Sequence, residues 1–110
     1  MNVWTGSGRI RAAPHISYTQ AGAARAAFSL EVERPESRGA TDFINVVAWG
    51  ADAEDVRDFC AAGEFVEVQG FLQARTYRAD GKEKRIYEIV AHKISFPFRK
   101  LKEIQREKTK

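Results

Sequence analysis

The sequence has little of what disulfide-bonded, secreted or membrane-spanning proteins require. Its single cysteine, Cys60, cannot form an internal disulfide, which is typical of proteins in a reducing cytosol. No apolar run approaches the roughly 20 residues needed to cross a bilayer. The first residues, Met1 to Trp4, lack the basic and apolar regions of a signal peptide. We therefore expect a cytoplasmic protein.

Residue patterns for catalysis or metal binding are also missing. His15 lies beside a predicted turn and His92 in a predicted strand, and neither has a second His or Cys at ligand spacing. Gly6 and Gly8 lie inside a predicted strand with no helix after it, so they do not form a phosphate-binding loop. We expect no enzyme, no cofactor and no metal site.

The length of 110 residues suits one domain with one core. The net charge of +3 is concentrated in residues 99–110, which hold six Lys or Arg and two Glu, so the remainder is close to neutral. We expect a domain over residues 1–98 and a basic C-terminal tail over 99–110. The tail is open to several interpretations: a disordered segment or short surface helix, extra phosphate contacts, a partner-binding helix using Leu101 and Ile104, or the loss of an acidic extension.

Charges of opposite sign also separate within the domain. Acidic side chains crowd one short segment, Asp52, Glu54, Asp55 and Asp58. Basic side chains crowd another, Arg75, Arg78, Lys82, Lys84 and Arg85. This separation predicts one acidic face and one basic face, and the basic face would attract polyanions.

Alternating apolar and polar residues predict an all-β protein with one short helix. The strands are expected at 2–12, 16–18, 24–33, 41–50, 64–77 and 84–96, with the helix at 52–62. Asp80-Gly81 predicts a tight hairpin turn, and 34–39 a polar loop. The strand glycines permit bends or bulges. About five curved strands, with a helix between the third and the fourth, indicate a five-stranded OB-fold barrel, which binds oligonucleotides on one face.

The segment 41–50 carries two large aromatics, Phe43 and Trp49, at positions six apart. Side chains alternate faces in a strand, so both rings share one face with Val47, and Val46 lines the other. The aromatic face is either a subunit interface or a platform on which flat groups stack, and nucleobases are a common partner of that kind. Trp4 is expected in the core or an interface.

Spaced motifs resemble the bacterial single-stranded DNA-binding protein family over roughly residues 2–96. They are Gly8-Arg-Ile10 with Pro14 and Tyr18, Gly22 through Phe28-Ser-Leu30, Thr41-Asp-Phe-Ile-Asn-Val-Val-Ala-Trp-Gly50, Val66-Glu-Val-Gln-Gly-Phe-Leu-Gln-Ala-Arg-Thr-Tyr77, Asp80-Gly81 and Tyr87-Glu-Ile-Val90.

The resemblance implies a homo-oligomer, usually a tetramer, that coats single-stranded DNA without sequence preference in replication, recombination or repair. It implies base stacking on Phe43, Trp49 and Tyr77, with Arg75 in the basic strand beside the last of these. The other candidate phosphate contacts are Arg9, Arg11, Arg34, Arg78, Lys84 and Arg85. A solvated sheet edge is the alternative role for these cations.

The sequence departs from the family pattern in three places, and the first is Arg9 and Arg11, which replace residues that are usually less basic. The loop 34–39 lacks the family's aromatic, and residues 99–110 are basic where the family has an acidic tail that recruits partners. The second hypothesis is therefore an OB-fold interaction module, such as a primosome-type or accessory subunit, for which a dimer is expected. RNA binding on the same face is a third.

Overall fold

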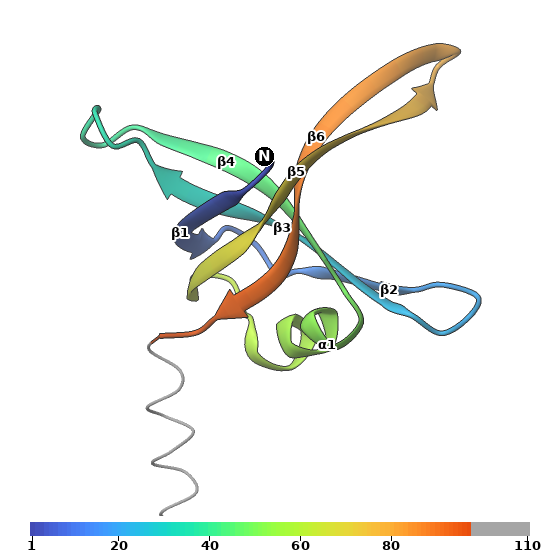
Figure 1. The fold of residues 1–110 in the computed structure, drawn as a ribbon, viewed down its shortest axis with the longest axis horizontal. Helices are drawn as coiled ribbons and strands as arrows, with labels where there is room; N and C mark the ends of the chain where they lie inside the picture. The colour runs from blue at the N-terminus through green and yellow to red at the C-terminus, as the bar shows by residue number, and fades with distance from the viewer. Residues whose placement is uncertain (98–110) are drawn as a thin grey trace, which may run out of the picture.

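The computed structural model describes residues 1–97, so the predicted tail 99–110 lies outside the described residues. Within these described residues, six strands and one helix follow one another (Figure 1). They are β1 (Trp4–Ile10), β2 (His15–Tyr18), β3 (Ala24–Glu33), β4 (Thr41–Trp49), α1 (Gly50–Phe59), β5 (Phe65–Ala79) and β6 (Lys82–Ser95). The helix α1 is too short and too polar to cross a membrane, and within residues 1–97 it is the one α-helix.

Five of the strands close into a ring. The hydrogen-bonded order is β1-β5-β6-β4-β3, and an antiparallel pairing of β1 with β3 joins the two ends. Among the strands that the structure describes, the short strand β2 pairs only with β3, and the β4–β6 pairing is parallel. The helix connects β4 to β5, between the third and fourth strands of the barrel. The predicted OB-fold architecture is confirmed.

The core lies inside this ring and follows the alternation of the strands. Phe28 and Leu30 of β3 and Val46 of β4 are buried there, together with Ile89 of β6. The helix lies below the barrel in Figure 1 and adds Ala53 and Val56 to the same cluster. Each large apolar side chain buried in this way stabilises the fold by about 1.5–3 kcal/mol.

A close approach of two strands at Gly8 lets the barrel close. A Cβ atom at this position would overlap the backbone oxygen of Glu31 on β3. The pairing of β1 with β3 is limited to Arg9 and Ile10, immediately after this contact. The role of Gly8 is therefore close packing of backbones, where the sequence predicted a bend or bulge.

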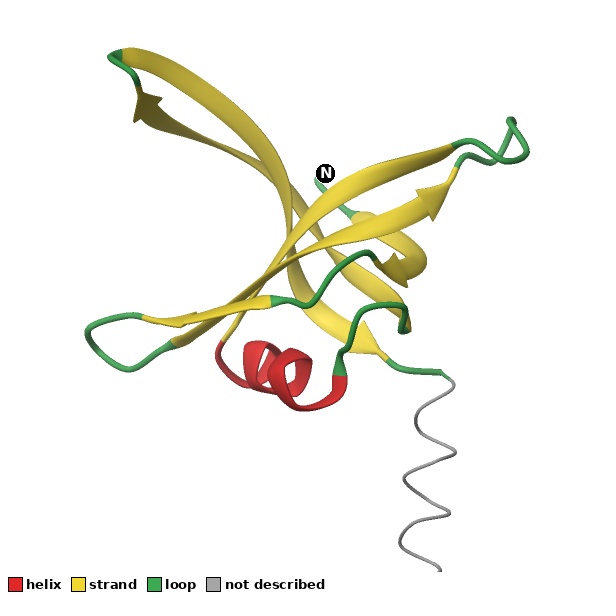
Figure 2. Ribbon diagram, turned by 180° about the vertical axis from the view of Figure 1, so that it is seen from behind, coloured by secondary structure: helices red, strands yellow, loops and turns green. Residues whose placement is uncertain are grey.

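The bounds of the helix and of the last hairpin differ from the prediction. The helix begins at Gly50 and ends at Phe59, so the predicted helix range 52–62 was wrong at both ends. The helix ends at Phe59 because Cys60 already has extended dihedral angles (φ −104°, ψ 116°). Strands β5 and β6 continue to the two-residue turn, in which Asp80 and Gly81 both have positive φ. The predicted turn type is confirmed, and the β5–β6 hairpin projects as a long arm (Figure 2).

Candidate nucleic-acid interface

Strand β4 presents its two aromatics on the outer side of the barrel, the side that faces away from the core. Phe43 is 49% exposed and Trp49 is 43% exposed, whereas Val46 and Ala48 are buried inside. Val47 lies between the rings on the outer side but is itself buried. Six residues of strand span roughly 20 Å. The two rings are therefore separate stacking positions, which a single base cannot bridge.

The turn from β4 into α1 fixes the position of Trp49. Gly50 has a φ of +61°, a conformation that L side chains rarely adopt, and it begins the helix directly after the strand. Trp49 keeps extended angles (φ −127°, ψ 153°) and so retains the alternation of the strand. The glycine that follows the tryptophan thus allows the indole to stay on the outer side.

Each of the two rings has an arginine against it. The guanidinium carbon of Arg11 lies 4.2 Å from the centre of the Phe43 ring, and that of Arg25 lies 5.7 Å from the Trp49 ring. Both distances fall within the range of cation–π contacts. Arg25 is the cross-strand partner of Trp49. It was absent from the sequence-based candidates, because the alternation of β3 gives its face but not its register against β4.

The arm formed by β5 and β6 carries the third aromatic. Tyr77 is 41% exposed and pairs with Lys84, and Arg75 pairs with Ile86. Lys84 and Val90 of β6 lie an even number of positions apart, so they face the same side, and Val90 pairs with Val47 of β4. Tyr77, Arg75 and Lys84 therefore share the outer side with Phe43 and Trp49.

Two predicted candidates lie on the opposite side of this arm. Arg78 pairs with Glu83, and Arg85 pairs with Thr76, one position out of phase with Tyr77. The arm is therefore basic on both of its sides, where the sequence predicted a single basic face.

A buried carboxylate holds Arg75 in place. Glu88 is 5% exposed, and within residues 1–97 it is the one charged residue that is buried. Its Oε1 atom accepts hydrogen bonds from Nε of Arg75 at 3.0 Å and from Nε2 of Gln73 at 3.1 Å. The side chain of Arg75 remains 46% exposed. The sequence did not reveal this pair, since a Glu in an alternating strand reads as a solvated residue.

Two more of the predicted cations are engaged within the protein. Arg34 donates to both carboxylate oxygens of Asp42 at 2.9–3.2 Å, and these hydrogen bonds hold the pKa of Asp42 below its ordinary value. The Nη1 atom of Arg9 donates to the backbone oxygen of Gly63 at 3.0 Å. Part of the hydrogen-bonding capacity of these two arginines is therefore already used within the protein.

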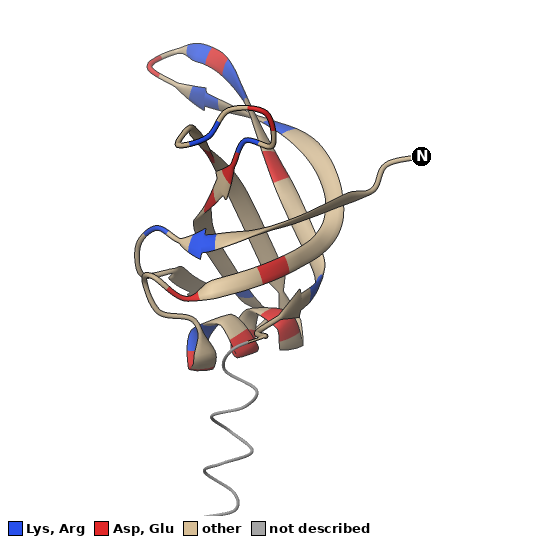
Figure 3. Cartoon of the chain, turned by 90° about the vertical axis from the view of Figure 1, so that its left-hand side faces the viewer, with Lys and Arg blue, Asp and Glu red and all other residues tan. Residues whose placement is uncertain are grey.

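The acidic segment predicted from the sequence lies at the other end of the molecule from the arm. The helix carries Asp52, Glu54, Asp55 and Asp58 below the barrel, and the basic arm extends above it (Figure 3). Burial, with the neighbouring Asp55, raises the pKa of Asp52. Within residues 1–97 no three His, Cys, Asp or Glu side chains are grouped to hold a metal ion.

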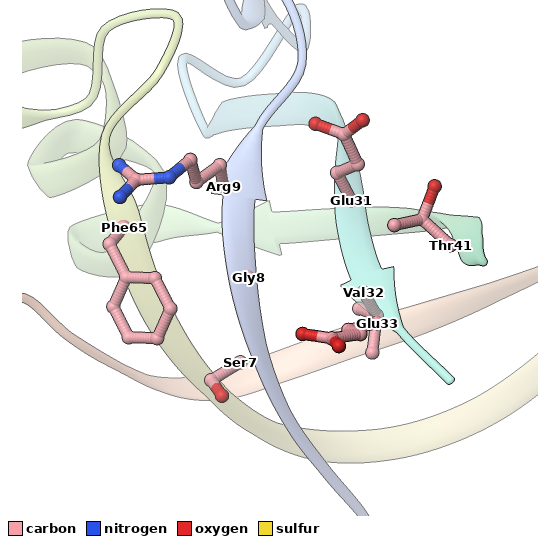
Figure 4. A pocket seen from close by; sticks show the side chains of 8 residues that line it. All are labelled: Ser7, Gly8, Arg9, Glu31, Val32, Glu33, Thr41 and Phe65. Carbon is pink, nitrogen blue, oxygen red and sulfur yellow. The ribbon is translucent and has the colours of Figure 1, made fainter. Parts of the chain in front are cut away.

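A pocket of about 540 Å³ opens between β1 and β3 (Figure 4). Its lining includes Arg9 and Phe65, but also the carboxylates of Glu31 and Glu33. Two carboxylates disfavour a phosphate chain, so this pocket is not part of the candidate interface.

Comparison with known proteins agrees with this geometry. Residues 1–97 match the model of the single-strand binding protein family. The chain belongs to that family. It is a family of binding proteins rather than enzymes, so the prediction that this chain is not an enzyme is confirmed.

Relatives in three bacteria are similar to most of the chain. It is 40% identical over 94 residues to a single-stranded DNA-binding protein 3 of Listeria innocua, covering 81% of this chain and 59% of the relative. A protein of the same name in Clostridium acetobutylicum is 36% identical over 94 residues, or 81% and 65% of the two chains. A single-stranded DNA-binding protein of Fusobacterium nucleatum is 31% identical over 102 residues, or 87% and 66%. The chain thus spans about three fifths of the length of these relatives.

Proposed function

We propose that this protein binds and coats single-stranded DNA without sequence preference, in the cytoplasm, during replication, recombination or repair. The observation that carries the proposal is the pair of half-exposed rings, Phe43 and Trp49, on the outer side of a closed barrel. The names of the relatives support the choice of DNA as the ligand.

Stacking and charge neutralisation together account for such binding. Unpaired bases stack on Phe43, Trp49 and Tyr77, each contributing roughly 1–3 kcal/mol. The flanking Arg and Lys side chains neutralise phosphates and release counterions, so affinity falls as salt rises. Bases of a duplex are already stacked and paired, and the protruding rings cannot reach their faces. Selection of a single strand then needs no base-specific hydrogen bond.

We also propose a homo-oligomer, as a tetramer or a dimer. Strand β1 pairs with β5 along Trp4–Arg9, whereas on its other side it pairs with β3 only at Arg9 and Ile10. Within the described residues, much of one edge of β1 is thus open to a second strand, and exposed strand edges favour pairing between chains. Light scattering gives the mass directly, and a monomer at micromolar concentration would contradict this part.

The test of the ligand compares three labelled oligomers of equal length. Fluorescence anisotropy with oligo-dT, with the matching duplex and with oligo-U should give tight binding to the DNA single strand only, weakening with salt. Equal affinity for the RNA would widen the ligand class to single strands in general. Equal affinity for the duplex would contradict stacking as the basis of recognition.

An interaction module is the second candidate. The arginines already in contact with Phe43 and Trp49 favour it, because they cover ring faces on which a base would have to stack. In that case the aromatic side would contact another protein, and nucleic-acid binding would be weak. A dimeric mass combined with no measurable binding to oligo-dT at low salt would support this candidate over the first.

A further inference from the structure

The arginines of the candidate interface fall into two groups by what holds them. Arg75 pairs with the buried Glu88, Arg34 pairs with Asp42, and Arg9 donates to the Gly63 carbonyl. For Arg11 and Arg25, by contrast, the guanidinium lies against an aromatic ring, and among the described residues it makes no hydrogen bond or ion pair. A cation–π contact at an exposed site is weak compared with a hydrogen-bonded ion pair.

The spacing leaves no room for a base between cation and ring. An inserted flat group needs a van der Waals contact of about 3.5 Å on each of its sides, or roughly 7 Å between the outer layers. Arg11 lies 4.2 Å from the centre of the Phe43 ring, and Arg25 lies 5.7 Å from that of Trp49. A base can therefore stack on the covered ring face only if the arginine leaves it.

We propose that Arg11 is a displaceable cap on Phe43, and that Arg25 plays the same part on Trp49. In the free protein the guanidinium covers a ring face; when a strand binds, a base takes that face and the guanidinium moves to a phosphate of the same strand. The inference rests on the proposed function, since it requires that bases stack on these rings.

The consequence is a specificity for strands over isolated flat molecules. A free base, or a flat apolar compound, can displace the cation but offers no phosphate to receive it. A polynucleotide offers both, so uncovering of the ring and neutralisation of the phosphate occur together. Arg11 and Arg25 would thus determine specificity in addition to supplying positive charge.

A double-mutant cycle measures this coupling. The dissociation constant for oligo-dT is determined for the wild type, Phe43→Ala, Arg11→Ala and the double variant, at one fixed salt concentration. Arg11 and Phe43 are exposed, so all four proteins should fold, and circular dichroism and thermal melting check this. The pair Arg9→Ala and Phe43→Ala is the matched control, because the guanidinium of Arg9 contacts Phe65 rather than Phe43.

The displaceable cap predicts the sign of the coupling. Without Arg11 there is no contact to break, so Phe43→Ala should weaken binding roughly two- to fivefold more in the Arg11→Ala background than in the wild type. The Arg9 control should be additive. The corresponding cycle of Arg25 with Trp49 should have the same sign and a smaller size, because that contact is longer.

Three results would overturn the inference in distinguishable ways. Additive losses with Arg11 would mean that the base uses the other ring face. A smaller cost of Phe43→Ala in the Arg11→Ala background would mean that ring and guanidinium hold the base jointly. If Phe43→Ala and Trp49→Ala have no effect in any background, the proposed stacking function itself fails.

Discussion

Both sides of strand β4 carry apolar side chains, but the two sides have different roles. On the inner side, Val46 and Ala48 are buried among residues of every barrel strand. On the outer side, Phe43 and Trp49 remain about half exposed, and each contacts an arginine rather than the core. Hydrophobicity alone does not separate these sides. The difference is that the inner residues stabilise the fold, whereas the outer ones leave an unused binding surface.

The largest effect expected from this comparison is on stability, from the inner side. Leu30→Ala, on the neighbouring strand β3, removes a fully buried side chain from this inner side and should lower the free energy of unfolding by about 2–5 kcal/mol, measured by denaturant titration. Affinity per folded molecule should not change. The matched outer variant, Phe43→Ala, should alter stability by no more than about 0.5 kcal/mol. Similar losses for both would contradict the division of roles.

On the outer side, Trp49→Ala should reduce the free energy of binding to oligo-dT by roughly 1–3 kcal/mol while the melting temperature stays near that of the wild type. Trp49→Phe keeps a stacking ring and should recover part of the loss. An unchanged affinity for Trp49→Ala would place this residue outside the interface.

Arg75 joins the two roles, since it is half exposed on the outer side but paired with a buried carboxylate. Arg75→Ala should lower both affinity and stability, the latter by about 1–3 kcal/mol, because Glu88 is left buried without its cation. The second substitution Glu88→Gln should restore stability but not affinity. Recovery of both would mean that Arg75 does not contact the nucleic acid.

The smallest effects concern the two sides of the β5–β6 arm. Lys84→Ala, on the side of Tyr77, should reduce the slope of log affinity against log salt by about 0.7, the value for one phosphate contact on a single strand. Arg85→Ala, on the opposite side, should change the slope less. Equal changes would mean that the strand wraps around the arm, and no change for Lys84 would remove it from the interface.

Local patterns carried most of the fold prediction. The alternation in β3 and β4, the turn at Asp80-Gly81 and the position of the helix between β4 and β5 could be predicted directly, because each depends on residues that are neighbours in the sequence. The helix bounds were wrong by a few residues, because Gly50 enables an abrupt turn that leaves no loop between β4 and α1.

The partners of the site residues could not be predicted in the same way. Which arginine covers which ring depends on strand register, and the pairing of Arg75 with Glu88 depends on how deeply β6 is covered. Six basic candidates besides Arg75 had equal status in the prediction from the sequence. In the structure, Arg9 and Arg34 have protein partners, and Arg78 and Arg85 lie on the far side of the arm. The local periodicity of a sequence does not show which residues make long-range contacts of this kind.

The central claim, that bases stack on the outer side of β4, is tested most directly by tryptophan fluorescence. Trp4→Phe leaves Trp49 as the one tryptophan, and Trp49→Phe leaves Trp4, which packs against the core. Titration of both variants with oligo-dT at low salt should quench the first strongly and the second little, with the quenching of the first reversed by added salt. Binding of oligo-dT by the Trp4→Phe variant without any change in its fluorescence would contradict the account.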